Sequence, residues 1–298
     1  MSKSLEVEDR ASRDLEVTQT KGSREENFPV GSLLISRSLR PHVATFYALA
    51  RATDDIADSA DLTPDEKLSK LERFERALTG ENLDDRGASK AYAVVRSCQE
   101  TGVEIRHSVD LIHAFKLDAT KQRYEDWTGL MAYCSLSAAP VGRFLLDLHG
   151  EKTSAYSCAD ALCNVLQVLN HLQDLQNDYQ ELNRIYLPLD WMSEFDVSIE
   201  DLGKPVTTPG LRCTIDRCLD GCSDLMSKAR LLPEILQNRR LAMESAVIVQ
   251  LADRLSMLLR KNDPIARRIN LTKRDFLECS VRGAIAHVFG GFSRVGRP

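Results

Sequence analysis

Apolar side chains recur every three or four residues along most of the chain, from about Phe28 onward. This spacing places them on one face of an α-helix, and no alternating stretch is long enough to build a β-sheet. In residues 39–58, for example, the apolar positions include Val43, Phe46, Tyr47 and Ala50. The pattern predicts helices over residues 39–58, 64–78, 90–100, 104–118, 125–148, 154–183, 211–237, 239–261 and 272–288.

Turn-forming residues mark the ends of these predicted helices. Thr63-Pro64-Asp65-Glu66 combines an N-cap residue with proline at the first helical position, and Thr79-Gly80 ends the same helix. Only 15 Gly and 10 Pro occur among 298 residues, which favours long helices. The sequence therefore predicts an all-α protein with one helical domain over residues 24–288. Residues 1–23 are expected to form a disordered leader and residues 289–298 a flexible basic tail.

Charge and cysteine usage narrow the class of protein. The net charge of −5 argues against nucleic acid as a partner. Eight cysteines occur without a C-x-x-C pair, so we expect reduced thiols in a cytoplasmic protein. No uninterrupted run of about 18 apolar residues occurs, so we expect no transmembrane span. A lipid substrate would then bring the protein into peripheral contact with the inner membrane.

The first candidate for chemistry is the acidic segment of residues 51–58. Asp54 and Asp58 are four residues apart and share one helix face. Arg51, three residues before Asp54, and Tyr47, seven residues before it, lie on the same stripe. The segment therefore presents two carboxylates together with a cation and a phenol.

A second polar stripe interrupts the otherwise apolar helix predicted over residues 154–183. Asn170, Asp174 and Asp178 recur every four residues, and Gln167 precedes Asn170 by three. Carboxylate and amide oxygens are hard ligands that suit Mg²⁺, which proteins bind through one or two carboxylates plus substrate phosphates. Either stripe alone is usually a solvated acidic face. Two such stripes, each inside an apolar helix, instead predict a clamp that holds a diphosphate through bridging metals.

These motifs resemble the squalene/phytoene synthase family over about residues 24–275. Residues 46–58 resemble its first aspartate-rich motif, and residues 166–178 followed by Asn183-Arg184-Ile185-Tyr186-Leu187-Pro188 resemble its second. Tyr133-Cys134 and Pro140-Val141-Gly142 resemble its central helix, and Arg267-Arg268-Ile269 with Lys273 its C-terminal basic motif. The resemblance implies an isoprenoid-synthase-type helical bundle with a central apolar cavity.

Within the family, the details resemble the hydroxysqualene synthases of bacterial hopanoid biosynthesis. The residues that carry this are 26–30 and 136–143. Relatives that run the first condensation usually have Ser where Asn27 stands, and often Arg where Gln173 stands. This branch implies conversion of presqualene diphosphate into hydroxysqualene by ionisation of the diphosphate, rearrangement of the carbocation and capture by water.

The resemblance also implies roles for individual residues. Mg²⁺, with Mn²⁺ as the alternative, would be held by Asp54, Asp58, Asn170, Asp174 and Asp178, and no NADPH is expected. The substrate would be bound by Phe28, Tyr47, Arg51, Tyr133, Gln167, Arg184 and Arg268, of which Tyr47 and Arg51 also belong to the catalytic set. For Phe28 and Tyr133, packing in the core is an equal alternative.

Other functions stay open at this point. Within the family, the chain could condense two farnesyl diphosphates to presqualene diphosphate, squalene or dehydrosqualene, or make phytoene. A terpene cyclase also uses a D-D-x-x-D stripe, but its second motif usually ends in Glu, whereas this chain has Asp174 and Asp178. A helical scaffold that descends from the same fold is the non-enzyme alternative, and the two intact stripes argue against it. The expected partners are a prenyl diphosphate and other enzymes of the squalene pathway that hand over substrate or product.

Overall fold

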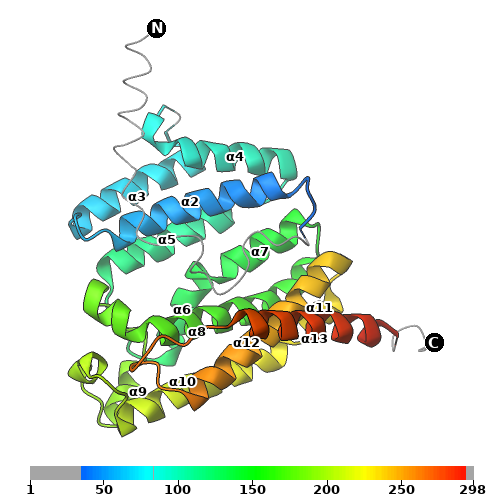
Figure 1. Cartoon of the computed structure of the whole chain (residues 1–298). Helices are drawn as coiled ribbons and strands as arrows, with labels where there is room; N and C mark the ends of the chain where they lie inside the picture. The colour runs from blue at the N-terminus through cyan, green and yellow to red at the C-terminus, as the bar shows by residue number, and fades with distance from the viewer. Residues whose placement is uncertain (1–34, 83, 293–298) are drawn as a thin grey trace. The chain divides into compact units, whose positions relative to one another are not determined.

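The computed structural model describes residues 35–82 and 84–292, which fold into α-helices joined by short turns and loops (Figure 1). Within these residues the only strand-like pairing is an isolated bridge between Tyr124 and Pro188. The predicted all-α fold is therefore confirmed. The contacts divide the chain into two compact units, Met1–Lys121 and Gln122–Pro298, and each is described by itself. The predicted leader lies outside the described residues.

The first unit contains four α-helices among its described residues. They are α2 (Arg40–Asp58), α3 (Pro64–Thr79), α4 (Ser89–Thr101) and α5 (Arg106–Thr120), with a short 3-10 helix η1 (Arg86–Ala88) before α4. Helix α2 packs against α3, α4 and α5. The shared core includes Leu49, Ile56, Leu71, Phe74 and Ile112. One face of α2 is therefore fixed by packing, which sets the direction of its acidic face.

Helix α3 begins and ends as its sequence predicts. The Thr63 side chain accepts a hydrogen bond from the Glu66 amide, and the Glu66 carboxylate accepts one from the Thr63 amide at 2.8 Å. This capping box satisfies amide groups that an unflanked helix start would leave without partners. Gly80 ends the helix with φ of +80°, a conformation that residues with a side chain rarely adopt.

The second unit is built around the 27-residue helix α8 (Tyr156–Leu182). Helix α8 packs against α6 (Trp127–Ser137), α7 (Ala139–Leu148), α10 (Pro209–Ala229) and α12 (Arg239–Lys261). Short elements connect these helices: η2 (Thr153–Ala155), α9 (Leu189–Glu194), η3 (Ile199–Gly203) and α11 (Leu232–Ile235). Helix α13 (Lys273–Phe292) packs against α12 and continues past the predicted end at residue 288.

Two predicted helices are interrupted in the structure. The helix expected over residues 125–148 divides at Ala138 into α6 and α7. Pro140 explains the break because it has no amide hydrogen and its ring clashes with the preceding turn of a continuous helix. The helix expected over residues 211–237 ends at Ala229, and Pro233 lies in the first turn of the separate α11.

A pair of stacked tryptophans joins α6 to α9. The rings of Trp127 and Trp191 are 5.3 Å apart and inclined by 14°, and the Arg217 guanidinium lies 4.8 Å from the Trp191 ring centre. A Cβ atom added to Gly221 of α10 would lie 2.7 Å from Trp127. The missing side chain at position 221 therefore makes room for the stack, which the sequence pattern did not predict.

Three polar residues of α5 are buried. Asp110 and Asp118 are at most 8% exposed, and His107 is 4% exposed. Asp110 forms an ion pair with Arg106 at 3.5 Å.

All eight cysteines are free thiols, as predicted.

Among the described residues, the segment Trp127–Leu148 is long and apolar enough by composition to cross a membrane. The sequence contains no uninterrupted apolar run there, because Arg143 and Asp147 fall inside the segment. It comprises α6 and α7, and 44% of it is buried inside the protein, as core helices of soluble proteins also are.

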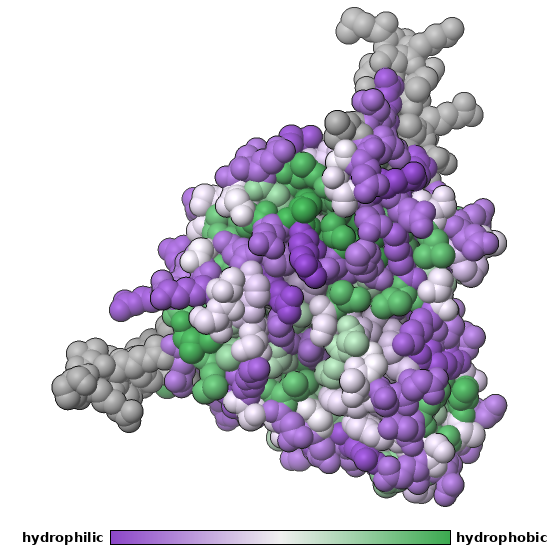
Figure 2. Space-filling view, turned by 180° about the vertical axis from the view of Figure 1, so that it is seen from behind, coloured by the Kyte–Doolittle hydropathy of each residue, from purple (hydrophilic) through white to green (hydrophobic). Residues whose placement is uncertain are grey.

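On the face drawn in Figure 2, hydrophobic patches alternate with hydrophilic side chains. Exposed apolar side chains also follow one side of α13, at Leu277, Val281 and Ile285.

Candidate active site

Helix α2 carries the first acidic stripe in the first unit. Its packed face includes Phe46, Leu49 and Ile56, so the side chains of Arg51 and Asp54 lie toward its margin and are only part-buried. Arg51 donates a hydrogen bond to Asp54 at 3.3 Å and lies 3.6 Å from the Asp55 carboxylate. Arg51 therefore holds two adjacent carboxylates, those of Asp54 and Asp55.

Asp54 keeps partial access to solvent despite this ion pair. Its side chain is 33% exposed, whereas that of Asp55 is 6% exposed. Asp58 and Tyr47 are also part-buried. Asp54 and Asp58 are thus accessible to a ligand, while Asp55 serves as a buried partner of Arg51.

Helix α8 carries the second stripe in the second unit. Asn170 and Asp174 are part-buried, and Asp178 is buried. Two nitrogens of Arg268 donate to the two oxygens of Asp174, at 2.5 and 3.1 Å. The structure thus brings together two residues that the sequence placed in separate motifs. A bidentate ion pair of this kind fixes the orientation of both side chains.

Gln173 ties the C-terminal basic motif to α8 from the buried side. Its side-chain amide donates to the carbonyl oxygen of Ile269, and its side chain is almost fully buried. Because Ile269 follows Arg268 directly, this hydrogen bond fixes the backbone beside the Asp174 partner. The sequence analysis noted Gln173 only as a departure from the family pattern. Nothing in the sequence indicated its hydrogen bond to the Ile269 carbonyl.

Buried rings pack beside the second stripe. His171 stacks on Tyr186 at 3.6 Å, and Tyr133 lies 6.1 Å from His171 and 5.5 Å from Tyr186. Gln167 makes a 3.2 Å hydrogen bond to the Nε2 atom of His171. Tyr133 is therefore part of an aromatic cluster in the core. Its contact with substrate stays a prediction, as does that of Gln167.

The end of α8 places Arg184. Asn183 adopts φ of +51°, which ends the helix, and Arg123 donates to its side-chain oxygen at 2.7 Å. The chain then turns back, so that the Arg184 amide donates to the Asp178 carbonyl at 2.9 Å. The Arg184 side chain is buried near the last turn of the acidic stripe. The local turn thus brings a second arginine, beside Arg268, to the acidic stripe of α8.

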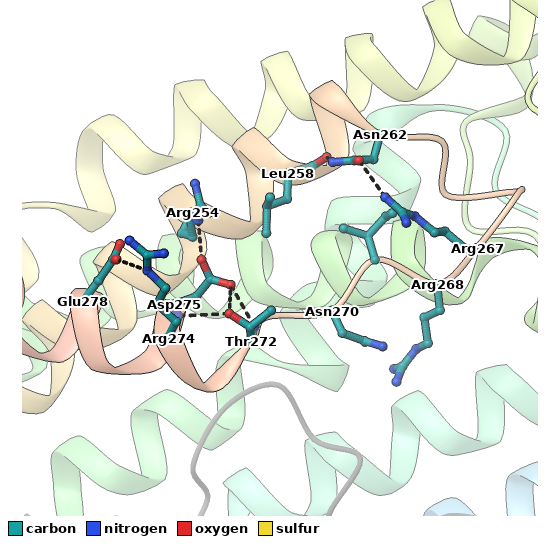
Figure 3. Close-up of a pocket in the computed structure, with 11 residues that line it drawn as sticks. Arg254, Leu258, Asn262, Arg267, Arg268, Asn270, Thr272, Arg274, Asp275 and Glu278 are labelled. Atoms are coloured by element: carbon teal, nitrogen blue, oxygen red, sulfur yellow. Dashed lines mark hydrogen bonds and ion pairs between the residues drawn. The ribbon is translucent and has the colours of Figure 1, made fainter.

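A pocket of about 670 Å³ lies between the end of α12 and the start of α13, as Figure 3 shows. Its wall includes Arg254, Arg267, Arg268 and Arg274. Burial alone would raise the pKa of Asp275 in this wall, but hydrogen bonds from Thr272 and Arg254 outweigh it and lower the pKa. The pocket is lined by charged side chains of both signs, so it differs from the apolar cavity expected for a prenyl chain.

The donor chemistry of both stripes fits Mg²⁺. Each helix offers carboxylate or amide oxygens as metal ligands. The nearby His171 ring stacks on Tyr186. Among the described residues, no group of three or more His, Cys, Asp or Glu side chains is arranged to hold a metal by itself. A site that depends on substrate phosphates needs no such group, since Mg²⁺ usually binds through one or two carboxylates plus phosphates. The closure of both stripes around one diphosphate stays a prediction. Phe28 lies outside the described residues.

Comparison with known proteins gives the class of this site and fold. Residues 22–275 match the squalene/phytoene synthase family, so the chain belongs to that family and is an enzyme of the head-to-head prenyl transfer type. It is 41% identical to a hydroxysqualene synthase of Rhodopseudomonas palustris over 89% of this chain and 90% of the relative. It is 38% identical to a hydroxysqualene synthase of Zymomonas mobilis over 90% of each. The crystal structure of squalene synthase HpnC from Alicyclobacillus acidocaldarius superposes with a TM-score of 0.70, at 29% identity over 86% of this chain and 92% of that one.

Proposed function

We propose that the protein converts presqualene diphosphate into hydroxysqualene, with Mg²⁺ and without a nicotinamide cofactor. The observation that carries this proposal is the similarity to hydroxysqualene synthases along about nine-tenths of both chains. All five oxygen ligands implied by the family motifs are present, at Asp54, Asp58, Asn170, Asp174 and Asp178. A cytoplasmic location with peripheral membrane contact, and exchange of substrate with other enzymes of the pathway, remain predictions.

The arginines would bind and orient the diphosphate. Arg51, Arg184 and Arg268 supply positive charge beside the two stripes, and Tyr47 supplies a hydrogen-bond donor. Bound Mg²⁺ would supply further positive charge that favours departure of the diphosphate. Electrostatic stabilisation of a leaving anion by prepositioned donors is usually the largest single contribution to catalysis of this kind. Arg184 is buried and Arg268 is fixed on Asp174, so both are held before substrate arrives.

The apolar helices would protect the cation that remains. Departure of the diphosphate leaves a cyclopropylcarbinyl cation, which rearranges and then forms a C–O bond with water. Buried side chains of α8, such as Leu169 and Leu172, keep bulk water away from this part of the second unit. Water must therefore enter at one defined position if an alcohol, and not a mixture, is to form.

The test is an incubation of the purified protein with presqualene diphosphate and Mg²⁺ but without NADPH, followed by lipid extraction and mass spectrometry. Hydroxysqualene is the expected product. Consumption of farnesyl diphosphate to presqualene diphosphate or a C30 hydrocarbon, with no alcohol from presqualene diphosphate, would assign another reaction of the family.

Alanine variants test the two stripes separately. We expect Asp54→Ala and Asp174→Ala to abolish turnover while the far-ultraviolet circular dichroism stays that of the wild type. Asp61→Ala and Asp224→Ala change exposed aspartates of the same two units and are the matched controls. Normal turnover in Asp54→Ala or Asp174→Ala would contradict the metal clamp, and loss of helicity would assign the stripe to folding.

A further inference from the structure

Helix α13 presents a row of large apolar side chains to solvent. Leu277, Val281 and Ile285 are 66%, 50% and 51% exposed. They follow one another at intervals of four residues, so they lie within an arc of about 80° on the helix surface. In the sequence, Val288 and Phe292 continue the helical spacing to the end of α13. Single exposed apolar residues are normal on a protein surface, but a continuous row of them marks an interaction site.

Contacts with α12 fix which side of α13 faces solvent. The residues two positions before the members of the row are buried and lie about 200° away around the helix: Asp275, Cys279 and Gly283. Asp275 accepts a hydrogen bond from Arg254 at 2.6 Å, and Cys279 donates one to the carbonyl oxygen of Gln250 at 3.5 Å. A Cβ atom added to Gly283 would lie 2.8 Å from the Val247 backbone. One close contact per turn therefore prevents α13 from rotating to bury the row against its own protein.

The charges beside the row are mostly positive. Lys273, Arg274 and Arg282 are exposed on α13, against a single exposed carboxylate among its described residues, that of Glu278. Arg274 and Glu278 pair at 2.7 Å. The sequence after the helix adds two arginines and no acidic residue, although the whole chain has a net charge of −5. An apolar row bordered by lysine and arginine is the composition of a helix that lies in a membrane interface.

The size and charge of this face favour a lipid surface over a second copy of the chain. A stable interface between proteins buries about 800 Å² on each partner, much more than three half-exposed aliphatic side chains supply. A symmetric contact would also place the same positive face of two copies together, and such like-charge contacts are unfavourable. A bilayer with anionic headgroups attracts the cations and accepts the apolar side chains without a matching shape.

We propose that the outer face of α13, defined by Leu277, Val281 and Ile285, docks on an anionic lipid surface, an inference that rests on the proposed function for its purpose. The three side chains enter the boundary between headgroups and acyl chains. Arg274, on the same helix, lines the pocket between α12 and α13 together with Arg268 (Figure 3). Docking therefore brings this pocket near the headgroups, where the diphosphate of a prenyl substrate lies while its chains remain in the bilayer.

The test measures co-sedimentation of the full-length protein with vesicles of phosphatidylcholine, with or without phosphatidylglycerol, in the absence of substrate and Mg²⁺. The wild type should bind the anionic vesicles much more tightly than the neutral ones. Val281→Ser should weaken this binding about fivefold, because it removes one half-exposed apolar side chain from the lipid. Val206→Ser is the matched control, since it changes the same residue type at 55% exposure outside the helix, and should bind as the wild type does. Arg282→Gln should weaken binding to the anionic vesicles about fivefold and leave binding to the neutral ones unchanged.

Equal binding of Val281→Ser and the wild type would overturn the inference, as would absence of wild-type binding to anionic vesicles at low salt. A dimer in analytical ultracentrifugation that Val281→Ser dissociates would also overturn it, because the row would then be a contact between copies. Val281 faces solvent, so its variant should keep the wild-type Tm, and Leu277→Ser repeats the test one turn earlier.

The vesicle measurement involves no turnover, so the inference and the proposed function can fail separately. With presqualene diphosphate dispersed in detergent, Val281→Ser should form hydroxysqualene at the wild-type rate. Vesicle binding that depends on Val281, without hydroxysqualene from the wild type, would support the docking face and contradict only the proposed function.

Discussion

Arg268 offers the sharpest separation of a catalytic from a structural role. Its guanidinium forms two hydrogen bonds to Asp174, and the next residue upstream, Arg267, donates one hydrogen bond to Asn262 at 3.0 Å. Both arginines line the pocket between α12 and α13. Arg268→Ala and Arg267→Ala therefore remove the same side chain from adjacent positions of one segment.

The expected effects on stability and on turnover differ in size. The side chains of Arg268 and Asp174 are 33% and 18% exposed, and accessible ion pairs contribute about 0–1 kcal/mol to the free energy of unfolding. That corresponds to a fall in Tm of at most about 4 °C. If Arg268 binds the leaving diphosphate, its loss should slow turnover by about 10²–10³, the effect of removing one prepositioned donor. Arg267→Ala should change neither quantity appreciably.

The assay is diphosphate release from presqualene diphosphate and, separately, from farnesyl diphosphate, at saturating Mg²⁺. This readout does not depend on which product forms, so it tests Arg268 whatever the reaction within the family. Turnover of Arg268→Ala close to that of Arg267→Ala would refute the reasoning. A large fall in Tm that accompanies the fall in turnover would show that the Asp174 pair holds the fold.

Three further predictions concern other parts of the chain. Gly210→Ala should lower Tm by several degrees, because the added Cβ atom would lie 2.2 Å from the Phe195 carbonyl oxygen. Gly203→Ala is the control and should leave Tm unchanged, because its added Cβ atom would lie 3.6 Å from the nearest atom. Equal Tm values for the two variants would contradict this prediction. Hydrogen bonds from Arg73 lower the pKa of Asp85, so its contribution to stability is present above the unfolded pKa of about 3.9 and is lost as the pH falls through the lower folded value. In urea unfolding, the difference between wild type and Asp85→Asn should therefore be larger at pH 7 than at pH 3, and a pH-independent difference would count against it. Chelation of Mg²⁺ with EDTA should stop diphosphate release and added Mg²⁺ should restore it, while persistent release in EDTA would exclude the metal requirement.

Local signals in the sequence predicted local structure well. The start of α3 at Pro64 follows from Thr63 and Glu66, because all the groups of that cap lie within four residues. Spacing also showed that Asp54 and Asp58 share a face of α2. These features depend only on neighbours in the chain, which a sequence pattern records.

Contacts between distant residues had no such signal. Arg268 and Asp174 are 94 residues apart, and Gln173 and Ile269 are 96 apart. The sequence named Arg268 and Asp174 as site residues through separate motifs but not as partners. The break at Ala138 was missed for a different reason: apolar periodicity continues across it, so the pattern outweighed the signal of Pro140.

The stacked tryptophans give the second unit an optical reporter of its own. Trp127 and Trp191 are the only two tryptophans in the chain, and both lie in the unit Gln122–Pro298. Indole emission excited at long wavelength therefore follows that unit alone, whereas circular dichroism at helical wavelengths follows both. Coincident denaturation curves from the two signals would show that the units unfold as one cooperative block, and separated curves would give the stability of the second unit independently of the first.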